Sequence, residues 1–256
     1  GTTRMTFTVP DGSTGAWAYV AVAGDVLVGS ISAGEQFSDA VFAYDLNTGK
    51  LRWRHAGSIL RNSTLAIAGS KVFFVEHRGQ TRAPVAFTKP ASALAQARRR
   101  GETAPVPVEP YVRTVVALDL ATGDPAWTRD MDLVGCGAWV NELCLMVKRD
   151  VVLLSGIYGW VLSESDKDER RMLALSTRDG ATMWDRTTSS LIRPVLVGDR
   201  ILGRPNAFDL RTGAPVMRGG PKGATPWMNN AQIRCGQMTA SAGMLFFRSG
   251  STIMMD

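Results

Sequence analysis

The residues with the clearest chemical potential lie near the C-terminal end of the chain, in the segment WMNNAQIRCGQ (227–237). Asn229, Asn230 and Arg234 could offer amide and guanidinium groups to a polar or anionic ligand, with the Cys235 thiol packing beside them. The same amides could instead satisfy backbone groups in a loop between two structural elements. The sequence favours this structural interpretation and leaves the ligand site as the alternative.

The histidines and cysteines do not form a pattern typical of a metal site or a catalytic centre. His55 and His77 lie in different parts of the chain, and neither has a second ligand three or four residues away. The three cysteines show no Cys-x-x-Cys spacing. Cys136 and Cys144 could bridge across a hairpin and leave Cys235 unpaired, but we expect small buried thiols instead. We therefore expect no metal site, no Ser-His-Asp hydrolase and no catalytic residue.

With 256 residues, 45% of them hydrophobic and 20% charged, the chain has the composition of a globular protein. Its net charge of +6 is the excess of 29 basic residues, 23 Arg and 6 Lys, over 23 acidic residues. The basic residues are scattered, apart from a run of three Arg at 98–100. We expect that run to be the solvated end of a helix, so no nucleic-acid partner is expected. No apolar run is long enough for a transmembrane segment, and no signal peptide opens the chain, which begins at Gly1.

An internal repeat, Ala-x-Asp-x-x-Thr-Gly-x-x-x-Trp, indicates the structural elements that would position the candidate residues. The four copies are AYDLNTGKLRW (43–53), ALDLATGDPAW (117–127), ALSTRDGATMW (174–184) and AFDLRTGAPVM (207–217). The third copy has Ser176 in place of Asp, and the fourth has Met217 in place of Trp. Apolar residues alternate on both sides of a turn in which Gly supplies a positive φ, so each copy predicts a β-hairpin.

A second hairpin accompanies the repeat. Short strands around a tight turn are predicted at 20–30, 65–75, 146–156, 195–203 and 238–250. Two hairpins give four strands per unit, which predicts an all-β chain folded as a β-propeller. We place the blades of this single domain, 1–256, at about 17–57, 62–131, 138–188 and 191–218, with an incomplete fifth at 236–256.

Two features set this propeller apart from a regular closed ring. The fifth blade stops where its third strand should begin, and a closed ring is what removes exposed strand edges. We therefore expect a partial propeller of about four to five blades, and a segment of a longer chain with a larger ring. The insert 82–110 contains good helix formers at 92–100 and three prolines after them, which predicts a short helix and an extended return.

The repeat resembles the tryptophan-docking repeat of quinoprotein propellers. These are the pyrroloquinoline quinone (PQQ) dehydrogenases, including quinoprotein alcohol dehydrogenases, and the lipoprotein of the outer-membrane β-barrel assembly machinery. Four segments resemble more narrowly the PQQ-binding-like β-propeller repeat proteins of planctomycete-type bacteria. They are WAYVAVAGDVLVGS, ALAQARRRGE, RRMLALSTRDGATMWD and PWMNNAQIRCGQMTASAGMLFFRSGSTIMMD.

The resemblance implies a structural role for the repeat and an extracytoplasmic, periplasmic location. Trp53, Trp127 and Trp184 would each dock between adjacent blades, and Met217 would give a weaker contact. The residues that would fix the turns are Asp45, Asp119, Asp209, Gly49, Gly123, Gly180 and Gly213.

Two functions are compatible with this resemblance. The first is a non-catalytic binding or scaffolding propeller, whose loops and strand edges receive a protein or a small polar ligand. The second is a segment of a PQQ-dependent dehydrogenase, an oxidoreductase that would hold PQQ with calcium between an aromatic floor and a disulfide of adjacent cysteines. The chain has no adjacent cysteine pair, so we favour the first function and predict no cofactor.

Overall fold

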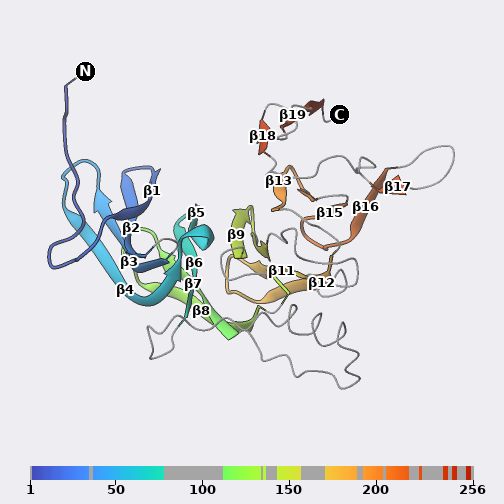
Figure 1. Ribbon diagram of the computed structural model, residues 1–256, viewed down its shortest axis with the longest axis horizontal. Helices are drawn as coiled ribbons and strands as arrows, with labels where there is room; N and C mark the ends of the chain where they lie inside the picture. The colour runs from blue at the N-terminus through green and yellow to red at the C-terminus, as the bar shows by residue number, and fades with distance from the viewer. Residues whose placement is uncertain are drawn as a thin grey trace, which may run out of the picture. The chain divides into compact units, whose positions relative to one another are not determined.

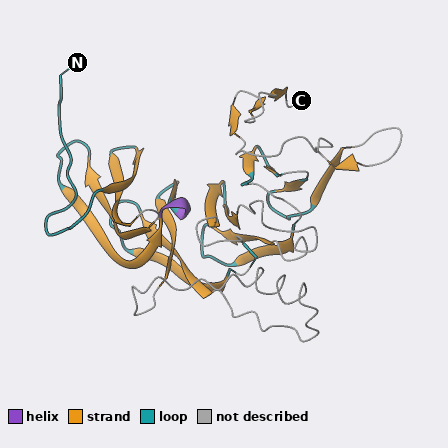
Figure 2. Ribbon diagram, in the orientation of Figure 1, coloured by secondary structure: helices purple, strands orange, loops and turns teal. Residues whose placement is uncertain are grey.

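The computed structural model of the protein is built almost wholly from antiparallel β-strands (Figure 1 and Figure 2). It describes residues 2–34, 37–77, 112–133, 135–136, 143–156, 171–188, 193–203, 206–218, 225–226, 239–241, 244–246 and 252–254. Within these ranges the only helical element is the single turn η1 (Asn62–Thr64). The predicted helix in the insert 82–110 lies outside the described residues.

The chain divides into two compact units. The first takes residues 1–86, 111–133 and 177–180, and the second takes 87–110, 134–176 and 181–256. Among the described helical residues, none belongs to a helix long and apolar enough to span a membrane.

The first unit contains two four-stranded blades whose strands follow the chain order (Figure 1). The first blade consists of β1 (Trp17–Ala23), β2 (Val26–Gly34), β3 (Phe37–Asp45) and β4 (Leu51–Arg61). The second consists of β5 (Ala66–Ala68), β6 (Lys71–His77), β7 (Val112–Asp119) and β8 (Pro125–Asp132). The blades join into one sheet because β4 pairs with β6, at Ile59 with His77 and at Leu60 with Glu76.

The second unit repeats this arrangement. One sheet consists of β9 (Leu143–Lys148), β10 (Val151–Gly156), β11 (Arg171–Ser176) and β12 (Thr182–Thr187). The next consists of β13 (Val195–Val197), β14 (Arg200–Leu202), β15 (Ala207–Asp209) and β16 (Pro215–Arg218), extended by β17 (Thr225–Pro226). Three more strands form the last sheet, β18 (Thr239–Ser241), β19 (Met244–Phe246) and β20 (Thr252–Met254).

Antiparallel sheets of four strands, repeated along the chain, make this an all-β partial propeller. The predicted fold class is therefore confirmed. The predicted hairpins also form, since β1 pairs with β2, β5 with β6, β9 with β10, β13 with β14 and β18 with β19. The single domain and its blade boundaries stay predictions.

Strands β2 and β3 are buried on both faces because their side chains alternate between two cores. Val28 and Val41 belong to a core shared with the second blade. Leu27 and Phe42 belong to a separate core against which Phe7 of the N-terminal segment packs. The first blade is thus covered by the second blade on one face and by the N-terminal segment on the other.

A β-bulge recurs beside the tryptophan of the repeat. In the first three copies the repeat Ala pairs directly with the repeat Trp, and the next pair closer to the turn skips one residue. The pairs are Ala43 with Trp53, Ala117 with Trp127 and Ala174 with Trp184. A bulge twists its strand and re-aims the neighbouring side chain, so it helps to set the direction of the indole.

The fourth copy lacks this bulge. Ala207 pairs with Val216 and Phe208 with Pro215, so Met217 does not lie opposite the repeat Ala. Met217 pairs instead with Pro226 of β17. The fourth copy therefore differs from the others in strand register as well as in residue type.

Candidate functional site

The predicted ligand-binding residues Asn229, Asn230, Arg234 and Cys235 lie outside the described residues. The site that the structure does describe is the set of turns that link the third and fourth strand of each blade. We call these the repeat turns; they comprise residues 45–49, 119–123, 176–180 and 209–213.

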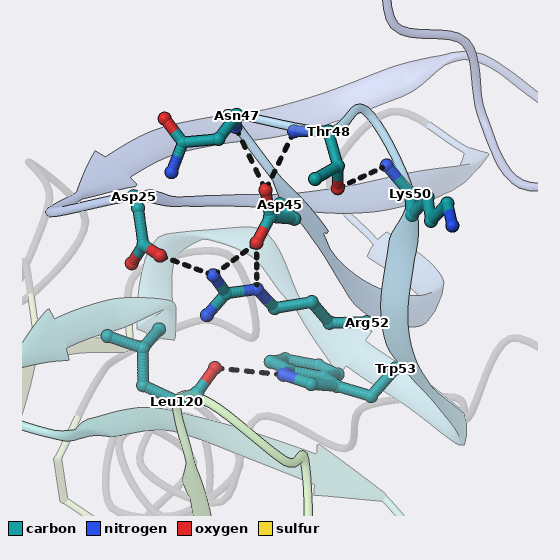
Figure 3. A network of polar contacts seen from close by, with 8 residues as sticks. All are labelled: Asp25, Asp45, Asn47, Thr48, Lys50, Arg52, Trp53 and Leu120. Carbon is teal, nitrogen blue, oxygen red and sulfur yellow. Dashed lines mark hydrogen bonds and ion pairs between the residues drawn. The ribbon is translucent and has the colours of Figure 1, made fainter.

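In the first repeat turn the carboxylate of Asp45 accepts hydrogen bonds from two backbone amides of the turn and from the guanidinium of Arg52 (Figure 3). Its Oδ1 accepts hydrogen bonds from the backbone N–H of Asn47 at 2.9 Å and of Thr48 at 2.8 Å. Its Oδ2 accepts from Arg52 Nη2 at 2.6 Å. The same Arg52 nitrogen lies 2.5 Å from Asp25 Oδ2, so the guanidinium ties the repeat turn to the turn between β1 and β2.

The second and fourth repeat turns use the same carboxylate contacts. Asp119 Oδ1 accepts from the N–H groups of Ala121 and Thr122 at 2.8 and 3.0 Å. Asp209 Oδ1 accepts from the N–H groups of Arg211 and Thr212 at 3.1 and 2.8 Å. The third turn has Ser176 in place of the repeat aspartate. These contacts support a structural role for the repeat aspartates, which stays a prediction.

Hydrogen bonding to the ionised form holds the pKa of each repeat aspartate low. Arg52, followed by the Thr48 amide, lowers the pKa of Asp45 from its ordinary value of 3.8 to about 2. The Thr122 amide lowers the pKa of Asp119, and the Thr212 hydroxyl lowers that of Asp209. All three carboxylates are therefore ionised at neutral pH.

The low pKa of Asp45 predicts how the first repeat turn responds to acid. Because the pKa of Asp45 is lower in the folded state, its ionised carboxylate stabilises the fold at pH values above the unfolded-state pKa of 3.8. This stabilisation is lost as the pH falls towards about 2. The wild type should have a higher free energy of unfolding than Asp45→Asn. This difference should be constant near neutral pH and shrink between about pH 4 and pH 2. Urea unfolding at a series of pH values measures it; a difference that stays constant down to pH 2 would contradict the assigned pKa.

Each repeat tryptophan donates a hydrogen bond to the carbonyl of the second residue of the repeat turn that follows it in the sequence. Trp53 Nε1 donates to the Leu120 carbonyl at 2.9 Å (Figure 3), and Trp127 Nε1 to the Thr177 carbonyl at 3.0 Å. In the second unit Trp184 Nε1 donates to the Leu210 carbonyl at 3.0 Å. The three indoles are buried, with 7–8% of their surface exposed.

The turn glycines let the indoles approach this closely. A Cβ on Gly123 would lie 2.5 Å from Trp53 Cγ, and one on Gly180 or Gly213 would lie 2.7 Å from an atom of the indole of Trp127 or Trp184. The three φ angles are +77°, +70° and +64°, a region that favours glycine. Met217, which stands at the tryptophan position of the fourth copy, is 47% exposed.

A buried carboxylate–imidazole pair in the first unit was not predicted from the sequence. His55 Nε2 lies 3.2 Å from Glu76 Oε2, and the Glu76 side chain is only 3% exposed. The two residues are 21 positions apart, on β4 and β6, so no local spacing could have indicated the contact. Gly57 leaves room for the carboxylate, because a Cβ there would lie 2.9 Å from Glu76 Oε2. The pair links β4 of the first blade to β6 of the second.

The described cysteines, Cys136 and Cys144, are buried thiols that are not bridged to one another, as the sequence led us to expect. Cys144 donates from Sγ to the Ser155 carbonyl at 3.1 Å, and burial raises the pKa of its thiol to about 11. We predict that Cys136 and Cys144 resist iodoacetamide at pH 8 in the folded protein and react once it is unfolded in urea. Mass spectrometry of labelled peptides measures this, and rapid native labelling of Cys144 would contradict its burial.

The described carboxylates do not gather into a calcium site. Calcium requires several carboxylate or carbonyl oxygens that are free to converge on it. The repeat carboxylates instead accept hydrogen bonds from their own turns, and in the described ranges no group of three His, Cys, Asp or Glu side chains could hold a metal. The arrangement is suited to holding blades in fixed positions.

Comparison with known proteins gives similarities of fold. No family model matches the chain, and no curated protein sequence matches it. Among solved structures, BamB from Moraxella catarrhalis is similar at 13% identity, over 91% of this chain and 58% of BamB, with a TM-score of 0.44. This chain thus spans less than two thirds of the BamB chain.

Two oxidoreductases are similar at the same level. A europium-containing methanol dehydrogenase has 13% identity, over 82% of this chain and 41% of that chain, with a TM-score of 0.45. The quinohemoprotein alcohol dehydrogenase ADHIIG from Pseudomonas putida HK5 has 12% identity, over 92% and 36%, with a TM-score of 0.44. At these identities the likeness concerns the fold alone.

Proposed function

We propose that this chain is a non-catalytic binding or scaffolding segment of a β-propeller, and that strand β1 is its binding edge. The observation that supports this is the exposure of Val20 and Val22, at 63% and 59%, the two highest values among the large exposed hydrophobic side chains described. Both lie on β1, which pairs with β2 on one side and is the end of the eight-stranded sheet.

An edge strand with exposed apolar side chains is suited to binding an extended segment of another protein. Its outer N–H and C=O groups can pair with an extended segment of another protein, and exposed apolar side chains add contact area. Val20 and Val22 are two residues apart and so project from the same face of the strand. We therefore propose an extended segment of a protein partner, added as a strand beside β1.

Site-specific crosslinking tests this edge. A photoreactive amino acid at Val22 should crosslink one protein reproducibly in cells that make the full-length product, while the same group at Met183, a 36% exposed residue on β12, should not. The double variant Val20→Lys with Val22→Lys should abolish the crosslink made from a neighbouring β1 position. Equal products from Val22 and Met183 would contradict a specific binding edge.

Titration with PQQ and calcium tests the non-catalytic part of the proposal. We expect no saturable change in absorbance or heat when the full-length product is titrated. Stoichiometric binding would overturn this part and favour the alternative, a segment of a PQQ-dependent dehydrogenase.

We also propose that the chain is a PQQ-binding-like repeat protein of the planctomycete type and is extracytoplasmic. The four sequence segments quoted above support the first statement, and the resemblance to quinoprotein propellers supports the second. A fusion of the full-length product to alkaline phosphatase, which is active only outside the cytoplasm, should be active. An inactive fusion of normal abundance would contradict the location.

A further inference from the structure

Arg149 has a backbone conformation that favours glycine. Its φ angle is +55°, and it is the one non-glycine residue with a positive φ in the part of the chain that the structure describes. It lies in the turn between β9 and β10 of the third blade (β9–β12). The corresponding turns of the first, second and fourth blades have Gly24, Gly69 and Gly198, with φ angles of +55° to +62°. A side chain in this region has a free-energy cost, which points to a role for the arginine itself.

Two ion pairs connect the third blade to the fourth (β13–β16). The Arg149 guanidinium pairs with the carboxylate of Asp199, in the turn between β13 and β14. In the opposite direction, Arg211 Nη2 of the fourth repeat turn lies 3.0 Å from Asp150 Oδ1 in the turn between β9 and β10. Each blade thus contributes one arginine and one aspartate, and we call these four residues the charge cluster.

The first two blades lack the residues for equivalent pairs. Gly24 occupies the position of Arg149, and Ala121 that of Arg211, so each pair would be missing its arginine. These two blades are joined instead by the pairing of β4 with β6. In the described ranges the third and fourth blades belong to separate sheets. The charge cluster therefore occurs at a junction that no strand pairing spans in these ranges.

The fourth blade consists of short strands. Its strands have three or four residues, whereas each strand of the third blade has six. Two groups of β12 also reach the fourth repeat turn. Trp184 Nε1 donates to the Leu210 carbonyl, and Arg186 Nε donates to the Thr212 carbonyl at 3.1 Å. Short strands open at low free-energy cost, so contacts with the third blade decide how often the fourth blade opens.

The charge cluster is exposed, which determines how it responds to salt. Its four side chains are 46–57% exposed. An exposed ion pair contributes little by itself, and dissolved salt screens it. Both pairs join the same two blades, so both are lost when the fourth blade separates from the third. Their combined contribution is small for the whole fold but significant for the opening of short strands.

We propose that the charge cluster is an ionic clamp, which holds the fourth blade on the third and makes the opening of the fourth blade depend on salt concentration. The two pairs favour the closed state at low salt, and screening weakens them as the salt concentration rises. The clamp also explains the φ angle of Arg149, because glycine at this position would relieve the backbone but lose one of the two pairs. The inference goes beyond the proposed binding role and does not depend on it.

Hydrogen–deuterium exchange of the full-length product, followed by mass spectrometry, tests the clamp. Peptides from 195–218 report on the fourth blade, and peptides from 143–156 and 171–187 report on the third. Raising NaCl from about 50 mM to about 1 M should speed exchange in the fourth blade about fivefold, because the pairs are screened. Exchange in the third blade should change less than about twofold, which corrects for the effect of salt on the exchange chemistry. Equal salt effects in the two blades would overturn the proposal.

Arg149→Gly removes one pair and supplies the residue that the other three blades have at this position. At about 50 mM NaCl it should speed exchange in the fourth blade about threefold, although it relieves the backbone of the third. At about 1 M NaCl the difference from the wild type should disappear, because the lost pair is already screened. A variant that exchanges no faster than the wild type at low salt would contradict the clamp.

Combining Arg149→Gly with Asp199→Asn shows whether the two side chains act through their contact. Asp199→Asn alone should speed exchange in the fourth blade by the same factor of about three, and the double variant should exchange no faster than either single variant. Arg52→Gln is the matched control, since it breaks an ion pair within the first blade and should leave the fourth blade unchanged. Effects of the two changes that multiply, or an equal effect of Arg52→Gln, would overturn the proposal.

Discussion

Replacing Trp184 with alanine is expected to lower the free energy of unfolding of the second unit by about 3–5 kcal/mol. The indole is 8% exposed and belongs to a core with Leu153, Met172 and Phe208. Its removal leaves a cavity, and it also leaves the Leu210 carbonyl, which accepts the indole N–H at 3.0 Å, without that donor. Urea unfolding followed by far-ultraviolet circular dichroism measures the loss without depending on tryptophan fluorescence.

The chain contains a matched control at the same position of the repeat. Met217→Ala removes a side chain that is 47% exposed, so its cost should stay within about 0.5 kcal/mol. Trp184→Phe keeps most of the apolar contact and loses the hydrogen bond, so it should cost about 1–3 kcal/mol. Equal effects of Trp184→Ala and Met217→Ala would show that the repeat tryptophan is not a docking residue.

The fold was predictable because its signals are local. A turn glycine with positive φ, flanked by alternating apolar residues, is visible within eleven residues of sequence, and the structure forms a hairpin at each copy. Gly49 and Gly123 both have the positive φ that the repeat implied. Counting two hairpins per unit was then enough to predict four-stranded blades.

Features that depend on register or on distant residues were not predictable. The bulge that sets Trp53 opposite Ala43 depends on where the extra residue is placed, and the fourth copy has the same spacing without the bulge. Glu76 reads as one acidic residue in an apolar strand, and only the pairing of β4 with β6 brings it to His55. Met5 on Gly49 is a further contact between residues 44 positions apart, in a segment with no repeat signal.

Replacing Gly123 with alanine should destabilise the first unit far more than the same change at Gly69. Both glycines lie in turns of the second blade and have positive φ angles, +77° and +57°. An added Cβ on Gly69 would meet nothing within 4 Å, so Gly69→Ala isolates the backbone cost, about 1–2 kcal/mol. At Gly123 the Cβ would lie 2.5 Å from the Trp53 ring, and the forced shift should add about 1–3 kcal/mol.

A double-mutant cycle assigns that additional cost to the indole contact. In a Trp53→Ala background the ring is absent but the Cβ of residue 53 stays, 2.8 Å from the added Cβ, so the cost of Gly123→Ala should fall while still exceeding that of Gly69→Ala. The two changes would then be coupled by about 1–3 kcal/mol, with the double variant more stable than the sum of the single effects predicts. Additive effects would mean that Gly123 is needed for the turn alone. Coupling would mean that the glycine serves both its own turn and the tryptophan of the preceding blade, which would explain why the repeat contains both residues.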